Sequence, residues 1–210
     1  MLVSDLEFLT FTQLNEILPN FEIESSPNSE FEIFNLSFSH STIANEKSVA
    51  FQTPQIAKTL LPLCLIISSW LPAGKDRILW ISSTSGIIPS SYQLLTAARN
   101  GWGEEKSIFE VPGMRFKNAN FKIGDIFEAD EAGFPILSVL ASTMQIMIQD
   151  NWDGWLMSSG CTERIEFWED YFIYYSSSSS KIEEAIRLMK YWDIHPSSGF
   201  YSIRNQLGFK

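Results

Sequence analysis

The stretch that decides the fold is residues 151–175, NWDGWLMSSGCTERIEFWEDYFIYY. Its aromatic and β-branched residues are typical of strands, and we expect three of them, at 153–158, 163–168 and 171–176. Glu169 and Asp170 separate the last two runs and predict a tight turn, although neither is the glycine that such turns favour. Consecutive strands with short connections form antiparallel hairpins, so this stretch predicts part of an antiparallel sheet.

Helices and strands alternate along the rest of the chain. Residues 133–149 give the clearest helix, with a broad apolar stripe at helical spacing. Residues 77–82, RILWIS, are apolar enough for a central strand. Further strands are expected at 31–38, 48–52 (paired with 31–38) and 107–111, and further helices at 5–18, 54–70, 89–100 and 181–192. This order predicts an α+β (mixed α/β) fold: a single sheet with several antiparallel strands and helices packed on it.

The length of 210 residues suits one domain, residues 1–210. A hydrophobic content of 45% and an aromatic content of 14% are sufficient for a sizeable core, which excludes disorder throughout the chain. Residues 1–50 could form a distinct N-terminal subregion, and residues 196–210 are expected to be a loose tail.

The charge is strongly acidic. The net charge is −10, and residues 1–46 contain eight carboxylates but no lysine or arginine. This balance argues against nucleic-acid and anionic-membrane partners, which bind through basic residues, and it favours a basic protein partner. Acidity that serves only solubility is the competing interpretation. The longest apolar run, LLPLCLII, is too short to span a bilayer, and no secretory signal is visible, so we expect a cytoplasmic protein of undetermined oligomeric state.

The residues that most often perform catalysis are sparse. His40 and His195 are the only histidines, and neither stands beside a serine or cysteine motif. Cys64 and Cys161 match no zinc spacing or disulfide framework, and no glycine-rich phosphate loop or calcium loop is present. The sequence therefore predicts a non-enzymatic protein without a metal or another cofactor.

Acids and aromatics alternate in and beside the strand-rich stretch. Since tryptophan and tyrosine dominate the energetics of protein interfaces, these residues are the candidate partner-binding site. The candidates are Trp152, Asp153, Glu163, Glu166, Trp168, Glu169 and Asp170. Two alternatives stay open: the tryptophans are core and the acids a solvated face, or paired carboxylates serve a small glycoside hydrolase.

Three segments give the chain a resemblance to acidic immunity proteins of bacterial polymorphic-toxin and contact-dependent inhibition systems. They are SYQLLTAARNGWGEEKSIFEVPGMRF, SVLASTMQIMIQDNWDGWLMSS and RIEFWEDYFIYYSS, and the likeness covers about residues 92–176. Met114 stands where such patterns often carry histidine. The resemblance implies a small cytosolic protein that binds and neutralises a cognate toxin. A regulatory or scaffold protein that binds a peptide at a sheet edge is the alternative.

Overall fold

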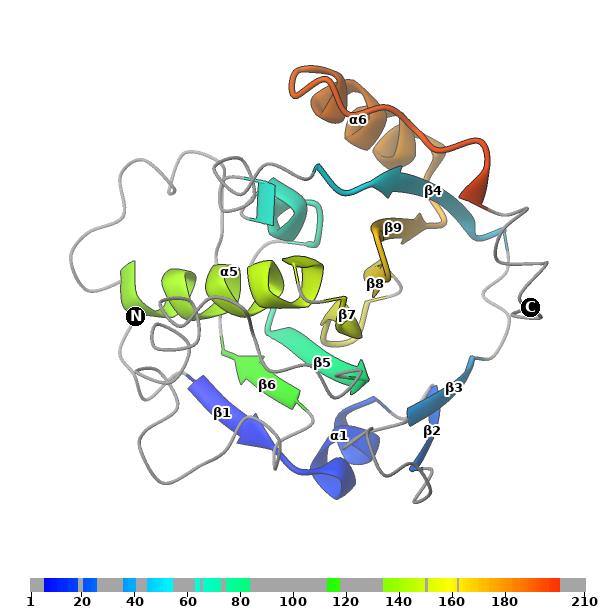
Figure 1. The fold of residues 1–210 in the computed structure, drawn as a ribbon. Helices are drawn as coiled ribbons and strands as arrows, with labels where there is room; N and C mark the ends of the chain where they lie inside the picture. The colour runs from blue at the N-terminus through cyan, green and yellow to red at the C-terminus, as the bar shows by residue number, and fades with distance from the viewer. Residues whose placement is uncertain are drawn as a thin grey trace.

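The computed structural model describes eleven segments of the chain. These are residues 6–18, 21–25, 36–40, 45–54, 63–64, 66–72, 75–83, 113–117, 134–149, 151–161 and 163–200. They form an α+β fold, as the sequence predicts, in which a sheet curves around helix α5 (Phe134–Gln149) (Figure 1). The expected strand at 107–111 and helix at 89–100 lie outside the described residues, as do residues 31–35 and 55–62.

The main sheet has seven strands in the order β1-β6-β5-β7-β8-β9-β4, and every neighbouring pair is antiparallel. In that order, the strands are Leu6–Leu9, Gly113–Phe116, Arg77–Ser83, Asp153–Ser158, Arg164–Trp168, Tyr171–Ser176 and Lys47–Gln52. Strands β7, β8 and β9 form the consecutive meander predicted from residues 151–175. The register of β8 and β9 pairs Trp168 with Tyr171, which confirms the tight turn at Glu169 and Asp170.

The concave face of the sheet carries the main core. Inward-facing residues of successive strands, such as Leu79, Leu156 and Ile165, pack with Met144 and Met147 of α5. A short helical segment at 66–69 and helix α6 (Ser179–Lys190) contribute to the same core, and α6 lies against β4 and β9. Gly154 lets β7 approach its neighbours closely, since a Cβ there would collide with the Trp80 carbonyl oxygen and the Met147 methyl group.

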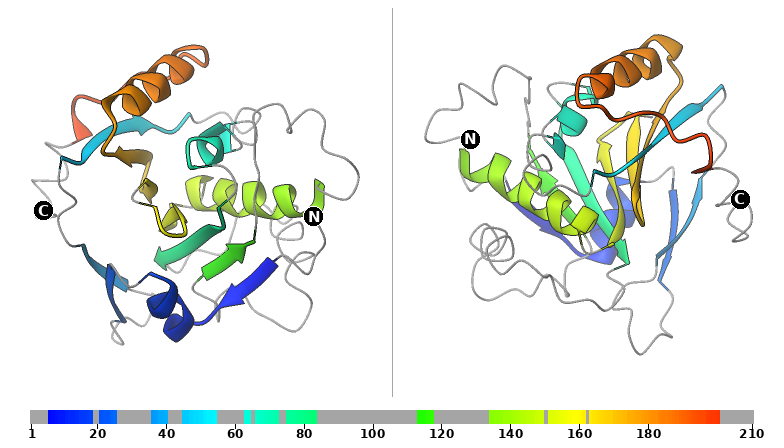
Figure 2. Two further views of the ribbon diagram at one scale, coloured as in Figure 1. Left: turned by 180° about the vertical axis from the view of Figure 1, so that it is seen from behind. Right: turned by 45° about the horizontal axis from the view of Figure 1, so that its top comes forward.

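The opposite face is covered by smaller elements (Figure 2). Helix α1 (Phe11–Ile17) packs Leu14 and the adjoining Leu18 against Trp80 and Trp155 of the sheet. Strands β2 (Phe21–Ser25) and β3 (Leu36–His40) form a separate two-stranded sheet, and β3 lies near β5. No helix among the described residues is long and apolar enough to cross a membrane.

Three predictions for the strands and helices differ from the structure. The helix predicted at 5–18 is wrong over residues 6–9, which form β1, because the Thr10 side chain accepts a hydrogen bond from the Gln13 N–H and so starts α1 only at Phe11. No strand was predicted at 113–116, where the structure has strand β6. The strand expected at 48–52 exists as β4, but it pairs with β9, and β3 pairs with β2.

The segment expected to be a loose tail is attached over residues 196–200. Pro196 forms an isolated antiparallel bridge with Phe51, and the Ser197 N–H donates to the Ala50 carbonyl oxygen at 2.8 Å. Phe200 is fully buried. Residues 201–210 lie outside the described part of the chain.

Candidate protein-binding site

Three carboxylates gather at one end of the sheet, where β8 turns into β9. They belong to Asp153, Glu169 and Asp170, which we call the acidic tip. Glu169 is exposed, and the other two are half-buried. The Glu169 N–H donates to Oδ1 of Asp153 at 3.1 Å, which joins the turn to the start of β7. The Thr53 N–H and hydroxyl both donate to the Asp170 carbonyl oxygen, at 2.8 and 2.9 Å, so the tip is held from two sides.

Glu169 adopts a backbone conformation that favours glycine. Its φ is 49°, in the left-handed region, where residues other than glycine, asparagine and aspartate are uncommon. Such positions in a structure point to a role that offsets the local cost. A carboxylate is therefore presented at the outermost position of the hairpin although glycine would suit the backbone better.

Trp168 lies behind the tip rather than on the surface. It is 8% exposed, and its ring meets Phe200 edge-on, with 5.6 Å between the ring centres, and stacks with Tyr171 at 6.5 Å. Phe200 from the C-terminal segment covers Trp168, so this candidate partner-binding residue is buried in the structure. Trp152 is also buried, as part of the main core.

Glu166 belongs to a buried polar network on the convex face. Its Oε2 accepts a hydrogen bond from the Tyr175 hydroxyl at 2.5 Å, and Glu166 is only 6% exposed. The neighbouring Arg164, 1% exposed, forms a two-pronged ion pair with Glu46 and lies under the Tyr175 ring. Sequence reasoning missed Arg164, Glu46 and Tyr175. The available signal was the alternation of Arg164, Glu166 and Trp168, which places all three on one face of a strand.

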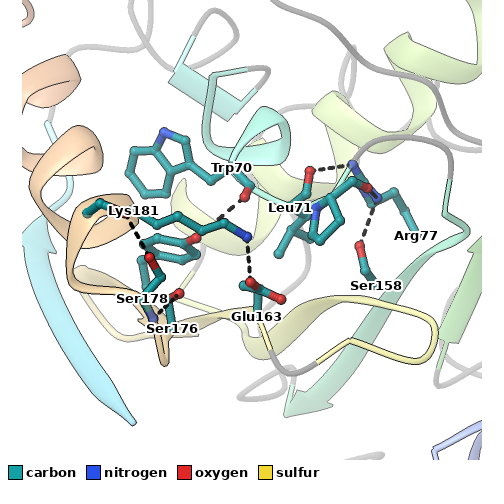
Figure 3. Close-up of polar contacts among 11 residues, drawn as sticks. Trp70, Leu71, Arg77, Ser158, Glu163, Ser176, Ser178 and Lys181 are labelled. Carbon is teal, nitrogen blue, oxygen red and sulfur yellow. Dashed lines mark hydrogen bonds and ion pairs between the residues drawn. The ribbon is translucent and has the colours of Figure 1, made fainter. Parts of the chain in front are cut away.

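Glu163 lies at the other end of β8, away from the acidic tip. Figure 3 shows the ion pair that it forms with Lys181 of α6. The Lys181 Nζ donates to Oε1 of Glu163 at 2.5 Å. Burial raises the pKa of Glu163, but the hydrogen bond and charge of Lys181 and the backbone hydrogen bond outweigh burial and lower it below 4.5. The structure thus groups Asp153, Glu169 and Asp170 of the predicted site and separates them from Glu163.

Arg77 is a buried cation, like Arg164, and it has a structural role. Figure 3 shows it together with the Glu163–Lys181 ion pair. Its guanidinium donates to the carbonyl oxygens of Leu71 at 2.9 Å and Pro72 at 2.6 Å, and to the Ser158 hydroxyl at 2.7 Å. Burial lowers the pKa of Arg77 to about 10. Arg77 therefore satisfies carbonyl groups that follow the helical segment 66–69 and fixes them to the end of β7.

The remaining candidates for chemistry are dispersed. Burial raises the pKa of the Cys64 thiol, which lies in the core. His195 is exposed and lies 3.1 Å from Asp193 through Nε2 and Oδ1. Within the part of the chain that the structure describes, no three His, Cys, Asp or Glu residues are grouped to hold a metal ion.

The comparisons with known proteins give no relative. No family model, no curated protein and no solved structure matches this chain.

Proposed function

We propose that this protein is a cytoplasmic immunity protein that binds a basic bacterial toxin domain through the acidic tip and neutralises it. The observation that carries the proposal is the exposed Glu169 carboxylate, held at a φ of 49° between Asp153 and Asp170. The resemblance of residues 92–176 to immunity proteins supports the same class of function. The protein acts by binding, and no catalytic step is part of the proposal.

The charge of the chain supports this role through the kinetics of association. A net charge of −10 attracts a basic partner over distances near the Debye length, and acids at a protruding turn orient it on approach. Exposed interface charges act mainly on the rate of association and on its salt dependence. The acidic tip is therefore expected to determine how fast the toxin binds.

The direct test is co-expression with the protein encoded by the neighbouring gene. That neighbour should be toxic when expressed alone and harmless when this chain is present. A neighbour that stays toxic in the presence of this chain removes the proposal.

Charge reversal tests the surface. The variant Glu169→Lys/Asp170→Lys should slow association with the toxin and flatten its dependence on ionic strength. The matched control is Glu183→Lys/Glu184→Lys, which reverses two exposed acids on α6 and so produces the same net charge. Equal slowing by both variants would show that net charge acts without a localised site.

A further inference from the structure

The segment after α6 turns back along the edge of the sheet. Asp193, with a φ of 56°, reverses the chain, and the Ile194 N–H donates to the Met189 carbonyl oxygen at 3.1 Å. Residues 194–200, which we call the strap, then run past β4, as the red segment in Figure 2 shows. Their backbone contacts with Ala50 and Phe51 lie on the outer side of β4, an edge that pairs with no other strand among the described residues, so the strap occupies part of that edge.

The strap ends in a small apolar cluster on the convex face. Phe200 is part of this cluster, with ring-centre distances of 5.1 Å to Tyr171 and 5.6 Å to Trp168. Ala50 and Ile173 complete this cluster, which is separate from the main core. We call the four residues other than Phe200, together with the outer edge of β4, the strap groove.

The strap is held mainly at its two ends. Ile194 and Phe200 are buried, whereas Pro196, Ser198 and Gly199 between them are exposed. Ile194 belongs to the main core, whereas Phe200 belongs to a separate cluster. Residues 196–200 have few buried contacts, and such a segment opens at a lower free energy than the central strands do. These residues can therefore leave the groove while Ile194 stays in the main core and the sheet stays folded.

The groove and the acidic tip are continuous. Trp168 and Tyr171 line the groove, and they directly flank Glu169 and Asp170 in the hairpin. Residues 194–200, IHPSSGF, contain no lysine or arginine that could pair with these acids. The strap therefore fits the groove and the outer edge of β4. It supplies no lysine or arginine to Glu169 and Asp170 at the rim of the groove.

We propose that the strap groove docks an extended segment of the basic partner, one that carries an aromatic side chain beside lysine or arginine. This inference rests on the proposed function and names the partner's chemistry. The partner's backbone takes the edge of β4, its aromatic ring replaces Phe200 against Trp168 and Tyr171, and its cations pair with the acidic tip. The strap occupies the groove until the partner displaces it. The partner's apparent affinity for the protein is therefore its affinity for the open groove multiplied by the fraction of molecules in which the groove is open.

The test uses the full chain and the synthetic peptide KPSSGFRK, which copies residues 196–200 and adds cations. The Phe200→Ala variant should bind this peptide at least about tenfold more tightly than the unaltered chain, because the competing ring is gone. Tyr191→Ala, which removes a ring that is 78% exposed and lies outside the groove, should bind like the unaltered chain. Equal affinity of Phe200→Ala and the unaltered chain would overturn the proposal.

Two further peptides separate the contributions of shape and charge. KPSSGARK lacks the aromatic ring and EPSSGFEE lacks the cations, and both should bind Phe200→Ala more weakly than KPSSGFRK does. Binding that is indifferent to the phenylalanine contradicts the groove. Binding that is indifferent to the cations contradicts the role of the acidic tip.

Hydrogen exchange on the unaltered chain gives an independent test in case Phe200→Ala does not fold. Saturating KPSSGFRK should speed exchange at the Ser197 N–H, which leaves its bond to Ala50, and leave Ile165 in the central strand unchanged. Unchanged exchange at Ser197 contradicts displacement. Peptide binding without toxin neutralisation would contradict the proposed function but support the groove as a docking site. Toxin neutralisation without peptide binding would support the proposed function but contradict the groove as a docking site.

Discussion

The guanidinium carbon of Arg164 lies 4.3 Å from the ring centre of Tyr175, its direct cross-strand neighbour on β9. The same guanidinium donates two hydrogen bonds to the carboxylate of Glu46. A guanidinium that is 1% exposed requires such compensation, because burial of an unpaired charge is costly. The network fastens the residue before edge strand β4 to the middle of the meander.

Replacing Glu46 should therefore destabilise the fold although its own side chain is partly exposed. In Glu46→Gln, the buried Arg164 loses its counter-charge, and we expect the free energy of unfolding to fall by about 3 kcal/mol. Urea denaturation followed by tryptophan fluorescence measures the change. The matched control, Glu184→Gln, breaks the exposed pair with Arg187 and should change stability by less than about 0.5 kcal/mol. Similar losses in both variants would contradict the structural role of the network.

Gly154 should not tolerate even one methyl group. In Gly154→Ala, the added Cβ collides with the backbone of β5 and with Met147 of α5, so we expect a loss of about 3 kcal/mol in the free energy of unfolding. Gly199→Ala is the control, since a Cβ there meets nothing within 4 Å and should leave stability nearly unchanged. Thermal unfolding of both variants measures the difference. A neutral Gly154→Ala would contradict the close approach of β7, β5 and α5.

The ion pair between Glu163 and Lys181 should make stability depend on pH on the acid side. The pKa of Glu163 is lower in the folded state than its ordinary value of 4.5, so the unfolded chain binds this proton more readily. The contribution is present above about pH 5 and is lost as the pH falls through the folded-state pKa. In Lys181→Met, the free energy of unfolding should decline less steeply below pH 5 than in the unaltered chain. Arg187→Met removes an exposed cation from the same helix and should leave that slope unchanged.

Glu169→Gly should raise stability while it weakens binding. Glycine relieves the left-handed backbone at this turn, which we expect to add about 1 kcal/mol to the free energy of unfolding. The same change removes a carboxylate from the acidic tip and should slow association with the proposed basic partner. Asp193→Gly, with a φ of 56° away from the acidic tip, is the control for backbone relief, and its gain in stability should be smaller because aspartate tolerates this conformation better than glutamate does. A destabilised Glu169→Gly would show that the carboxylate itself supports the turn.

The sequence predicted the elements whose signals are local. Strands β7, β8 and β9 and helix α5 begin and end within about one residue of their expected bounds, because each carries its own periodicity and ends at turn residues. Residues 6–9 were assigned to a helix because LEFL contains leucines at a spacing compatible with one. Their strand conformation depends on pairing with β6, more than 100 residues away, which no local pattern reveals.

In the candidate site, too, the sequence predicts the features with local signals and misses those that depend on distant contacts. The acidic tip could be predicted, since Glu169 and Asp170 stand at the turn of a recognisable hairpin. The burial of Trp168 could not, because Phe200 covers it from a segment that no pattern in the sequence connects to the hairpin. Likewise, Glu46 and Arg164 meet only because β4 pairs with β9, and this pairing joins the first quarter of the chain to its last.

The order of strands in the sheet has a consequence for how the protein is made. The two edge strands, β1 and β4, come from the first quarter of the chain, and their partners β6 and β9 come much later. At ribosomal rates of about 5–20 residues per second, β4 leaves the ribosome on the order of ten seconds before β9 exists. During that interval, Val49 and Phe51 lack β9, the strand with which β4 pairs. The nascent chain is therefore exposed to chaperones and to aggregation until the last third of the protein has been synthesised.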